Sequence, residues 1–382
     1  MPDETTVTLL TPVGRGALAT IAIEGEQAVS LVKQLFQPAS TVPLETISLE
    51  QIVFGNWSHL DGRREEVVVC RQADSRVEIH CHGGRAAAES MLSSLAMRGA
   101  RRRDESEWIR AHAADPIEAA ARLALSQART ERVAAVLLDQ YQGALRRTLI
   151  EVGQRYEKGD LESSRKLLAR LDDLGRLGQR LTSPWRIVCA GPPNVGKSSL
   201  VNAILGFERA IVLDQPGTTR DLVVAQTAID GWPVELSDTA GLHQADDPIE
   251  CEGVARAQDE MGRADLVVLV FDATQPLRST HQEQLKRWPQ ALVVANKCDL
   301  CPGPPDVSWK QAGRDPLFTS ALVGDGIEQL MAALITRLIP SVPHRGEAVP
   351  FTVEQCQTIE QVRSLYASGD ATAAAAQLSR LL

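Results

Sequence analysis

The feature that most constrains the fold of this chain is a glycine-rich loop near its middle. An apolar run, RIVCA at residues 186–190, leads into GPPNVGKS at 191–198, and the helical pattern SSLVNAIL follows. This order matches a phosphate-binding loop, which requires a buried strand before it and a helix after it. The glycines let backbone N–H groups surround a phosphate, while Lys197 neutralises phosphate oxygens and Ser198 offers a hydroxyl to Mg²⁺. The pattern predicts a parallel α/β sheet that binds a nucleoside phosphate, without saying which one.

A second phosphate motif follows the apolar run VELSD. Asp238 ends that run and can hold Mg²⁺ through water, and Gly241 can donate its N–H group to a γ-phosphate. Between the two motifs lies DQPGTTRD at residues 214–221, in which Thr219 reaches Mg²⁺ only while a γ-phosphate is present. Such a segment is a switch that a nucleoside triphosphate orders and its hydrolysis releases.

The choice of base is indicated by ALVVANKCDL, which places Asn296 and Asp299 after another apolar run. A carboxylate only accepts hydrogen bonds, so Asp299 suits the paired N–H donors of guanine, which adenine lacks at that edge. Asn296 can satisfy neighbouring polar atoms, and backbone N–H groups at 320–322 could meet the guanine carbonyl. The sequence therefore predicts that the nucleotide is GTP.

The predicted nucleotide site draws on all of these segments. The residues predicted to bind GTP are Asn194, Val195, Gly196, Lys197, Ser198, Ser199, Leu213, Asp214, Gln215, Pro216, Gly217, Thr218, Thr219, Asp238, Thr239, Ala240, Gly241, Asn296, Lys297, Asp299, Ser320, Ala321 and Leu322. Ser198 and Thr219 are the predicted Mg²⁺ ligands.

The catalytic device has to be unusual, because Leu242 follows the second motif and its side chain cannot orient water. Glu250, in the acidic stretch QADDPIE, is the candidate for positioning the attacking water. The alternative is that Glu250 is only a solvent-exposed residue of a loop. Asn194 and the segment 217–219 suggest a monovalent cation, which would supply the charge that an arginine supplies elsewhere.

The rest of the chain predicts further domains. Strand-like apolar runs alternate with helical patterns over residues 1–115, which indicates an α+β N-terminal domain. Residues 116–183 and 346–382 carry helical patterns on either side of the α/β segment 184–345. The expected fold class is therefore α/β, with a P-loop GTPase domain inserted in a helical domain and preceded by the α+β domain.

Composition excludes some functions. The net charge of −9 argues against a protein that binds nucleic acid over its whole surface, because that requires clustered Lys and Arg. No apolar run reaches the length of a membrane span and the N-terminus is acidic, so we expect a cytoplasmic protein without a membrane partner. The seven cysteines are expected to be free thiols. Cys298 and Cys301 lack the second pair that a zinc ribbon needs.

Four segments together, NVGKSS, RAIVLDQPGTTRD, DTAGL and NKCD, resemble the bacterial GTPases of the MnmE/TrmE, Era and EngA group. The N-terminal TPVGRGALATIAIEG and VEIHCHGG, with a GTPase domain set within a helical domain, narrow the resemblance to the MnmE/TrmE tRNA-modification GTPases. That resemblance implies a homodimer formed through the N-terminal domain, a flavoprotein partner similar to MnmG, and modification of the wobble uridine of tRNA with a folate one-carbon unit. By position it implies K⁺ ligands at Asn194, Leu213, Gln215 and Thr218, a catalytic Glu250 and a folate-site acid at Glu78.

The chain departs from this family at three places. The family's folate-site arginine is replaced by Ala22, and the loop before the HGG segment reads RQADSR. The chain ends SRLL, where the family has C-I-G-K with a cysteine assigned to the modification reaction.

Other functions stay open at the level of sequence. An Era-like or EngA-like GTPase of ribosome assembly shares the nucleotide motifs, although no RNA-binding G-x-x-G signature follows them. A GTP-gated binding module with little turnover is consistent with Leu242. The arginines at 101–103 could contact RNA, or could be solvated cations at a helix end.

Overall fold

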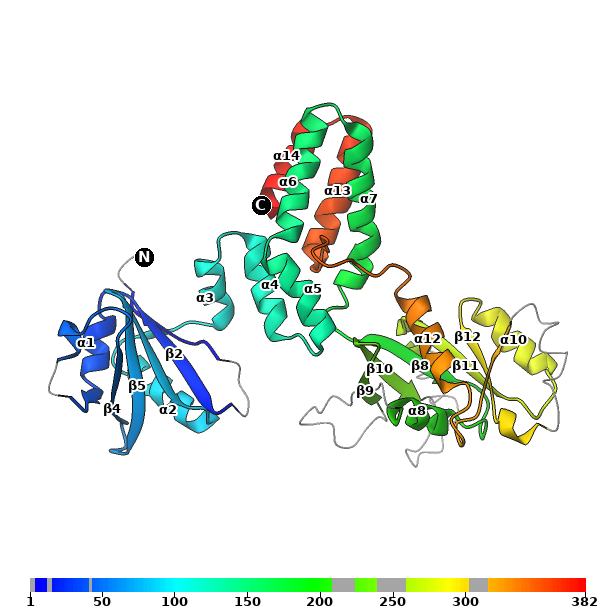
Figure 1. Ribbon diagram of the computed structural model, residues 1–382, viewed down its shortest axis with the longest axis horizontal. Helices are drawn as coiled ribbons and strands as arrows, with labels where there is room; N and C mark the ends of the chain where they lie inside the picture. The colour runs from blue at the N-terminus through cyan, green and yellow to red at the C-terminus, as the bar shows by residue number, and fades with distance from the viewer. Residues whose placement is uncertain (1–3, 12–15, 41–42, 208–223, 239–258, 302–314) are drawn as a thin grey trace. The chain divides into compact units, whose positions relative to one another are not determined.

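The computed structural model describes the chain except for residues 1–3, 12–15, 41–42, 208–223, 239–258 and 302–314 (Figure 1). The chain divides into two compact units, Met1–Ala119 and Ala120–Leu382. Within the described residues, none of the helices has the length and apolar character needed to cross a membrane.

The first unit is built on a seven-stranded sheet with the order β3-β4-β5-β6-β2-β1-β7. Its strands are β1 (Thr6–Leu9), β2 (Leu18–Glu24), β3 (Phe36–Pro38), β4 (Ile52–Ser58), β5 (Arg64–Ala73), β6 (Arg76–His82) and β7 (Arg101–Arg102). Neighbouring strands are antiparallel except for β1 and β7, which are parallel. Three helices, α1 (Ala28–Lys33), α2 (Arg85–Ala96) and α3 (Glu105–His112), and a 3₁₀ turn, η1 (Leu44–Thr46), complete the unit.

Alternation along the strands gives this sheet one apolar and one polar face. Ile21 and Ile23 of β2 and Ile79 of β6 are fully buried in a core with Met91 and Leu95 of α2. The intervening residues of the same strands include threonine, glutamate, arginine and histidine, and they lie on the other face because side chains alternate along a strand.

The second unit contains a six-stranded sheet with the order β13-β12-β11-β8-β10-β9. Its strands are β8 (Trp185–Ala190), β9 (Val224–Ile229), β10 (Trp232–Asp238), β11 (Leu266–Asp272), β12 (Leu292–Asn296) and β13 (Leu317–Thr319). Only β9 and β10 pair antiparallel. Every residue of β11 and β12 is buried, as expected for parallel strands covered on both faces.

Helices and one short turn surround this sheet. They are α8 (Lys197–Leu205), α10 (Ser279–Arg287), the 3₁₀ turn η3 (Cys298–Leu300) and α12 (Ile327–Leu338). Leu285 of α10 packs in one core with Leu269 and Phe271 of β11, whereas α8 and α12 contact each other.

Helices that precede and follow the sheet in the chain pack together, so the α/β part is inserted in a helical part. The helices are α4 (Pro116–Ser126), α5 (Glu131–Tyr141), α6 (Ala144–Glu157), α7 (Leu161–Gly178), α13 (Val353–Ser368) and α14 (Ala371–Leu381). Tyr156 of α6 stacks on Tyr366 of α13 with 3.7 Å between ring centroids, and Figure 1 shows α7 beside α13. The expected fold class is confirmed, while the domain boundaries at 115, 183 and 345 stay predictions.

Candidate nucleotide site

The phosphate-binding loop connects β8 to α8 through a backbone that requires glycine at two positions. Gly191 has φ 146°, and a Cβ there would lie 2.1 Å from the carbonyl oxygen of Val270. Gly196 has φ 93°, and its Cβ would lie 2.4 Å from Nδ2 of Asn296. Asn194 adopts φ 62° although it has a side chain. The loop is therefore held tightly by the strand and the guanine loop beside it.

Lys197 lies inside this loop and is 6% exposed. Its ammonium group donates to the carbonyl oxygens of Gly191 (3.1 Å) and Pro192 (2.9 Å). Burial lowers the pKa of Lys197, and the charge of Asp238 opposes that shift. A phosphate oxygen is a stronger partner for an ammonium than a neutral carbonyl, so this group is available to an anionic ligand.

The two phosphate motifs meet because β8 and β10 are parallel neighbours, with Cys189 opposite Asp238. The hydroxyl of Ser198 donates to Oδ2 of Asp238, which is 4% exposed. A hydroxyl beside a carboxylate offers the oxygen ligands that Mg²⁺ prefers. Ser198 and Asp238 therefore fit a Mg²⁺ ion. Across the described ranges, there is no cluster of three or more His, Cys, Asp or Glu residues that could hold a metal on its own.

The predicted guanine loop contacts the phosphate loop through Asn296. Its Nδ2 donates to the carbonyl oxygen of Val195 at 3.0 Å. Its Oδ1 accepts from the hydroxyl of Thr319 at 3.2 Å and from the N–H of Ala321 at 3.1 Å. Asn296 is 2% exposed, so its amide joins three segments of the predicted site rather than contacting solvent.

Lys297 also connects the guanine loop to the phosphate loop. It pairs with an acid, Asp272, that the sequence motifs did not identify. The Lys297 ammonium donates to the carbonyl oxygen of Asn194 at 2.6 Å and to Oδ2 of Asp272 at 2.8 Å. Asp272 ends β11 and is 9% exposed. The sequence offered one indication of this acid, because Asp272 directly follows the apolar run LVVLVF.

The remaining residues of the predicted guanine site differ in exposure, and two of the three backbone N–H groups at 320–322 already donate within the protein. Asp299 is exposed after β12, and Leu322 is 86% exposed. Ser320 is fully buried; its N–H donates to the carbonyl oxygen of Asp325 (2.9 Å) and its hydroxyl accepts from Val323 N (3.3 Å). The 320–325 loop is thus a compact turn at the end of β13.

Several predicted residues lie outside the described part of the chain. They are Leu213, Asp214, Gln215, Pro216, Gly217, Thr218, Thr219, Thr239, Ala240, Gly241 and Glu250. Of the four K⁺ ligands, only Asn194 is described.

The implied folate site lies on the polar face of the first sheet, and its residues do not fit that role. Glu78 accepts from Arg76 at 2.6 Å and from Gln72 at 3.2 Å, and its side chain is 13% exposed. Ala22 lies opposite Glu78 on β2 and is 1% exposed. The carboxylate is therefore already paired within the domain, and the position of the family's arginine holds a buried methyl group.

The three arginines considered as an RNA contact are also paired within their own unit. Arg101 contacts Glu4 at 2.8 Å, Arg102 contacts Glu89 at 2.6 Å, and Arg103 contacts Glu24. Arg101 and Arg102 form β7, so the triplet does not lie at a helix end, and each of its arginines has a carboxylate partner within the unit.

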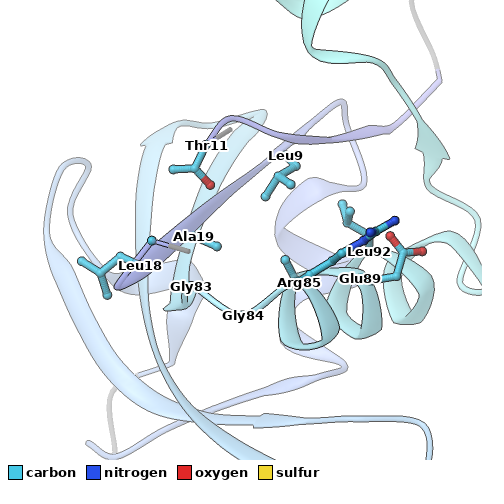
Figure 2. A pocket seen from close by; sticks show the side chains of 11 residues that line it. Leu9, Thr11, Leu18, Ala19, Gly83, Gly84, Arg85, Glu89 and Leu92 are labelled. Atoms are coloured by element: carbon cyan, nitrogen blue, oxygen red, sulfur yellow. The ribbon is translucent and has the colours of Figure 1, made fainter. Parts of the chain in front are cut away.

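A separate pocket opens beside the start of α2 (Figure 2). Leu9, Leu18 and Leu92 supply apolar walls, and Gly84 and Arg85 mark the helix end. Neither Glu78 nor Ala22 is among the residues that line it.

Two regions of the chain match described protein families. Residues 5–113 match the family described as GTP-binding protein TrmE N-terminus, and residues 186–297 match the family described as 50S ribosome-binding GTPase. A tRNA modification GTPase MnmE of Symbiobacterium thermophilum is 30% identical over 97% of this chain and 90% of its own length. One of Nitratidesulfovibrio vulgaris is 32% identical over 91% of this chain and 85% of its own length.

Among solved structures, the G domain of the T. maritima FeoB iron transporter is 29% identical and covers 40% of this chain and 98% of its own, with a TM-score of 0.31. The FeoB G domain of Methanococcus jannaschii is 26% identical and covers 41% of this chain and 98% of its own, with a TM-score of 0.30.

Proposed function

Since the chain belongs to the MnmE/TrmE family of tRNA modification GTPases, we propose that it uses GTP hydrolysis in the modification of the wobble uridine of tRNA. The chain is a GTP-hydrolysing enzyme. The tRNA role rests on the function of the relatives, and the nucleotide chemistry rests on the site.

The observation that carries the nucleotide chemistry is the contact between Ser198 and Asp238 beside the buried ammonium of Lys197. We infer that phosphate oxygens replace the carbonyl partners of Lys197 when GTP binds. Ser198 would hold Mg²⁺ directly and Asp238 through water, and the ion would supply charge to the β- and γ-phosphates. Asn296 and Asp299 would receive guanine at the other end of the site.

For catalysis we propose that Glu250 positions the attacking water and that K⁺ supplies the stabilising charge. Asn194 supports this proposal, because it is an exposed residue of the phosphate loop and its side chain carries an oxygen that a cation can bind. The other proposed K⁺ ligands are Leu213, Gln215 and Thr218.

The first test compares GTP hydrolysis by the purified protein in potassium and in sodium. We expect faster turnover in potassium and loss of that turnover in Glu250→Ala. Glu252→Ala, a change of the same type two residues away, serves as the control. Equal rates in both salts would remove the K⁺ proposal, and full activity in Glu250→Ala would remove the catalytic role.

The tRNA role is tested in cells that lack this gene. We expect the modified wobble nucleoside to disappear from tRNA digests, to return with the wild-type gene, and to stay absent with Lys197→Ala. Unchanged nucleosides after deletion would remove the role while leaving GTP hydrolysis intact. Ribosome cosedimentation of the wild-type protein would then favour ribosome assembly.

Partners and compartment belong to the same proposal. A homodimer through the N-terminal domain, a flavoprotein similar to MnmG and a cytoplasmic location would accompany the tRNA role. Folate is left out of the proposed reaction, because Glu78 is engaged by Arg76 and Gln72.

A further inference from the structure

The residues between the two halves of the nucleotide site include an acid with no assigned role. Asp272 stands at the carboxyl end of β11, which pairs with β8 on one side and β12 on the other. Its register partner on β12 is Asn296. Because the carboxyl ends of parallel strands meet at one edge of the sheet, Asp272 lies between the phosphate loop that follows β8 and the guanine loop that follows β12.

Both oxygens of the Asp272 carboxylate are occupied. Oδ1 accepts from the N–H of Thr274 at 3.0 Å and from its hydroxyl at 2.6 Å. Oδ2 accepts from the ammonium of Lys297 at 2.8 Å. Although burial acts to raise it, the pKa of Asp272 is lowered by these bonds from Lys297 and Thr274, which favour the charged form.

Lys297 has a backbone conformation that residues with side chains rarely adopt. It has φ 68°, and it bonds the carbonyl oxygen of Asn194, which has φ 62°. Two residues with side chains thus occupy the left-handed region and are joined to each other. The ammonium group of Lys297 makes this contact between the two loops, and the carboxylate of Asp272 balances its charge.

We propose that Asp272 is a positioning residue for guanine nucleotide binding: its carboxylate holds Lys297 so that the guanine loop and the phosphate loop keep one fixed spacing. Asp272 acts through Lys297 and does not touch the nucleotide. The proposal rests on the GTP site and is independent of the tRNA role.

A double-mutant cycle tests the proposal, with the dissociation rate of a fluorescent GDP from the full chain as the readout. Asp272→Asn keeps an oxygen for Thr274 and removes the charge that holds Lys297. We expect it to raise the GDP dissociation rate about tenfold, with a comparable rise in Lys297→Met. The double variant should match Lys297→Met within about twofold, because the two changes remove the same contact.

Three comparisons separate positioning from a general structural role. The kcat at saturating GTP should change less than about twofold in Asp272→Asn while KM rises, because the bond acts on binding. Thr274→Val, which loses only the hydroxyl bond to Asp272, should stay near wild type. Asp259→Asn is the matched control, because it removes an ion pair with Arg263 on the surface of the same domain.

The proposal is wrong if the increases in GDP dissociation rate caused by Asp272→Asn and Lys297→Met multiply in the double variant, because the two residues would then act independently. An effect of Thr274→Val as large as that of Asp272→Asn would also overturn it, since the turn would then be responsible. A wild-type protein that bound no guanine nucleotide would instead contradict the GTPase function itself.

Discussion

The polar face of the first sheet and the carboxyl edge of the second sheet both gather charged side chains, but they neutralise them differently. On the first, Glu24 contacts His112 at 2.8 Å and Arg76 at 3.6 Å, in addition to Arg103. On the second, Lys197 has carbonyl oxygens as hydrogen-bond partners. Charges that neutralise each other inside a domain hold the fold, whereas a buried charge held by neutral groups can exchange them for a ligand. A cluster of charges is therefore a binding site only where a ligand can improve on the existing partners.

The largest effect should come from Lys197→Ala. Two charge-assisted contacts to phosphate are each worth about 1.5–3 kcal/mol, so nucleotide affinity should fall at least about 100-fold. Titration with a fluorescent GDP measures the loss. Lys166→Ala is the control, because Lys166 is an exposed lysine that pairs with Glu162 on α7. Tight binding by Lys197→Ala would show that the buried ammonium is structural and would break the comparison.

The next effect concerns the Glu24 cluster. Glu24→Gln leaves three basic groups without their shared carboxylate, and we expect the first unit to lose about 2 kcal/mol of stability, because the glutamate side chain is only 17% exposed. Hydrogen exchange of β2 and α3 peptides in the full chain should accelerate accordingly. Glu26→Gln, at an exposed position two residues away, should have no effect. Unchanged exchange in Glu24→Gln would mean that this cluster does not hold the fold.

A smaller effect is expected from Asp272. Its ion pair with Lys297 lies in the nucleotide site, but its two charges neutralise each other as those of the Glu24 cluster do. The pKa of Asp272 is lowered in the folded protein, so its contribution is fully present above the unfolded value near 4 and is lost as pH falls through the folded value. Wild type should exceed Asp272→Asn by about 1 kcal/mol in unfolding free energy at pH 7. Urea unfolding at descending pH should show that gap closing below about pH 4. If the difference in unfolding free energy between wild type and Asp272→Asn did not depend on pH, the cause would be lost packing rather than lost charge.

The smallest effect is expected from Glu78→Gln. Because Glu78 is paired with Arg76 and Gln72, we expect neither a change in GTP hydrolysis nor measurable binding of a reduced folate by the wild-type protein. Calorimetric titration with 5-formyltetrahydrofolate measures the second point. Tight binding that disappears in Glu78→Gln would turn the polar face into a ligand site and erase the contrast between the two regions.

The nucleotide motifs could be recognised from the sequence because each is a contiguous segment whose own backbone performs the chemistry. GPPNVGKS implies a strand, a turn with glycines at fixed places and a helix start, and the structure places Lys197 and Ser198 accordingly. Asn296 was expected to satisfy neighbouring polar atoms, and it bonds Val195, Thr319 and Ala321. Such roles need little knowledge of the order of the strands.

The parallel α/β sheet, its guanine nucleotide and the helical segments around it could be predicted from the sequence, because period, turn chemistry and motif spacing are local properties. The partners of the individual acids, in contrast, could be seen only in the folded chain. The role of Asp272 depends on β11 lying between β8 and β12. The pairing of Glu78 depends on Gln72 reaching it from the neighbouring strand β5. Both are long-range consequences of strand order, because the partners of a buried charge are chosen by the elements that pack beside it.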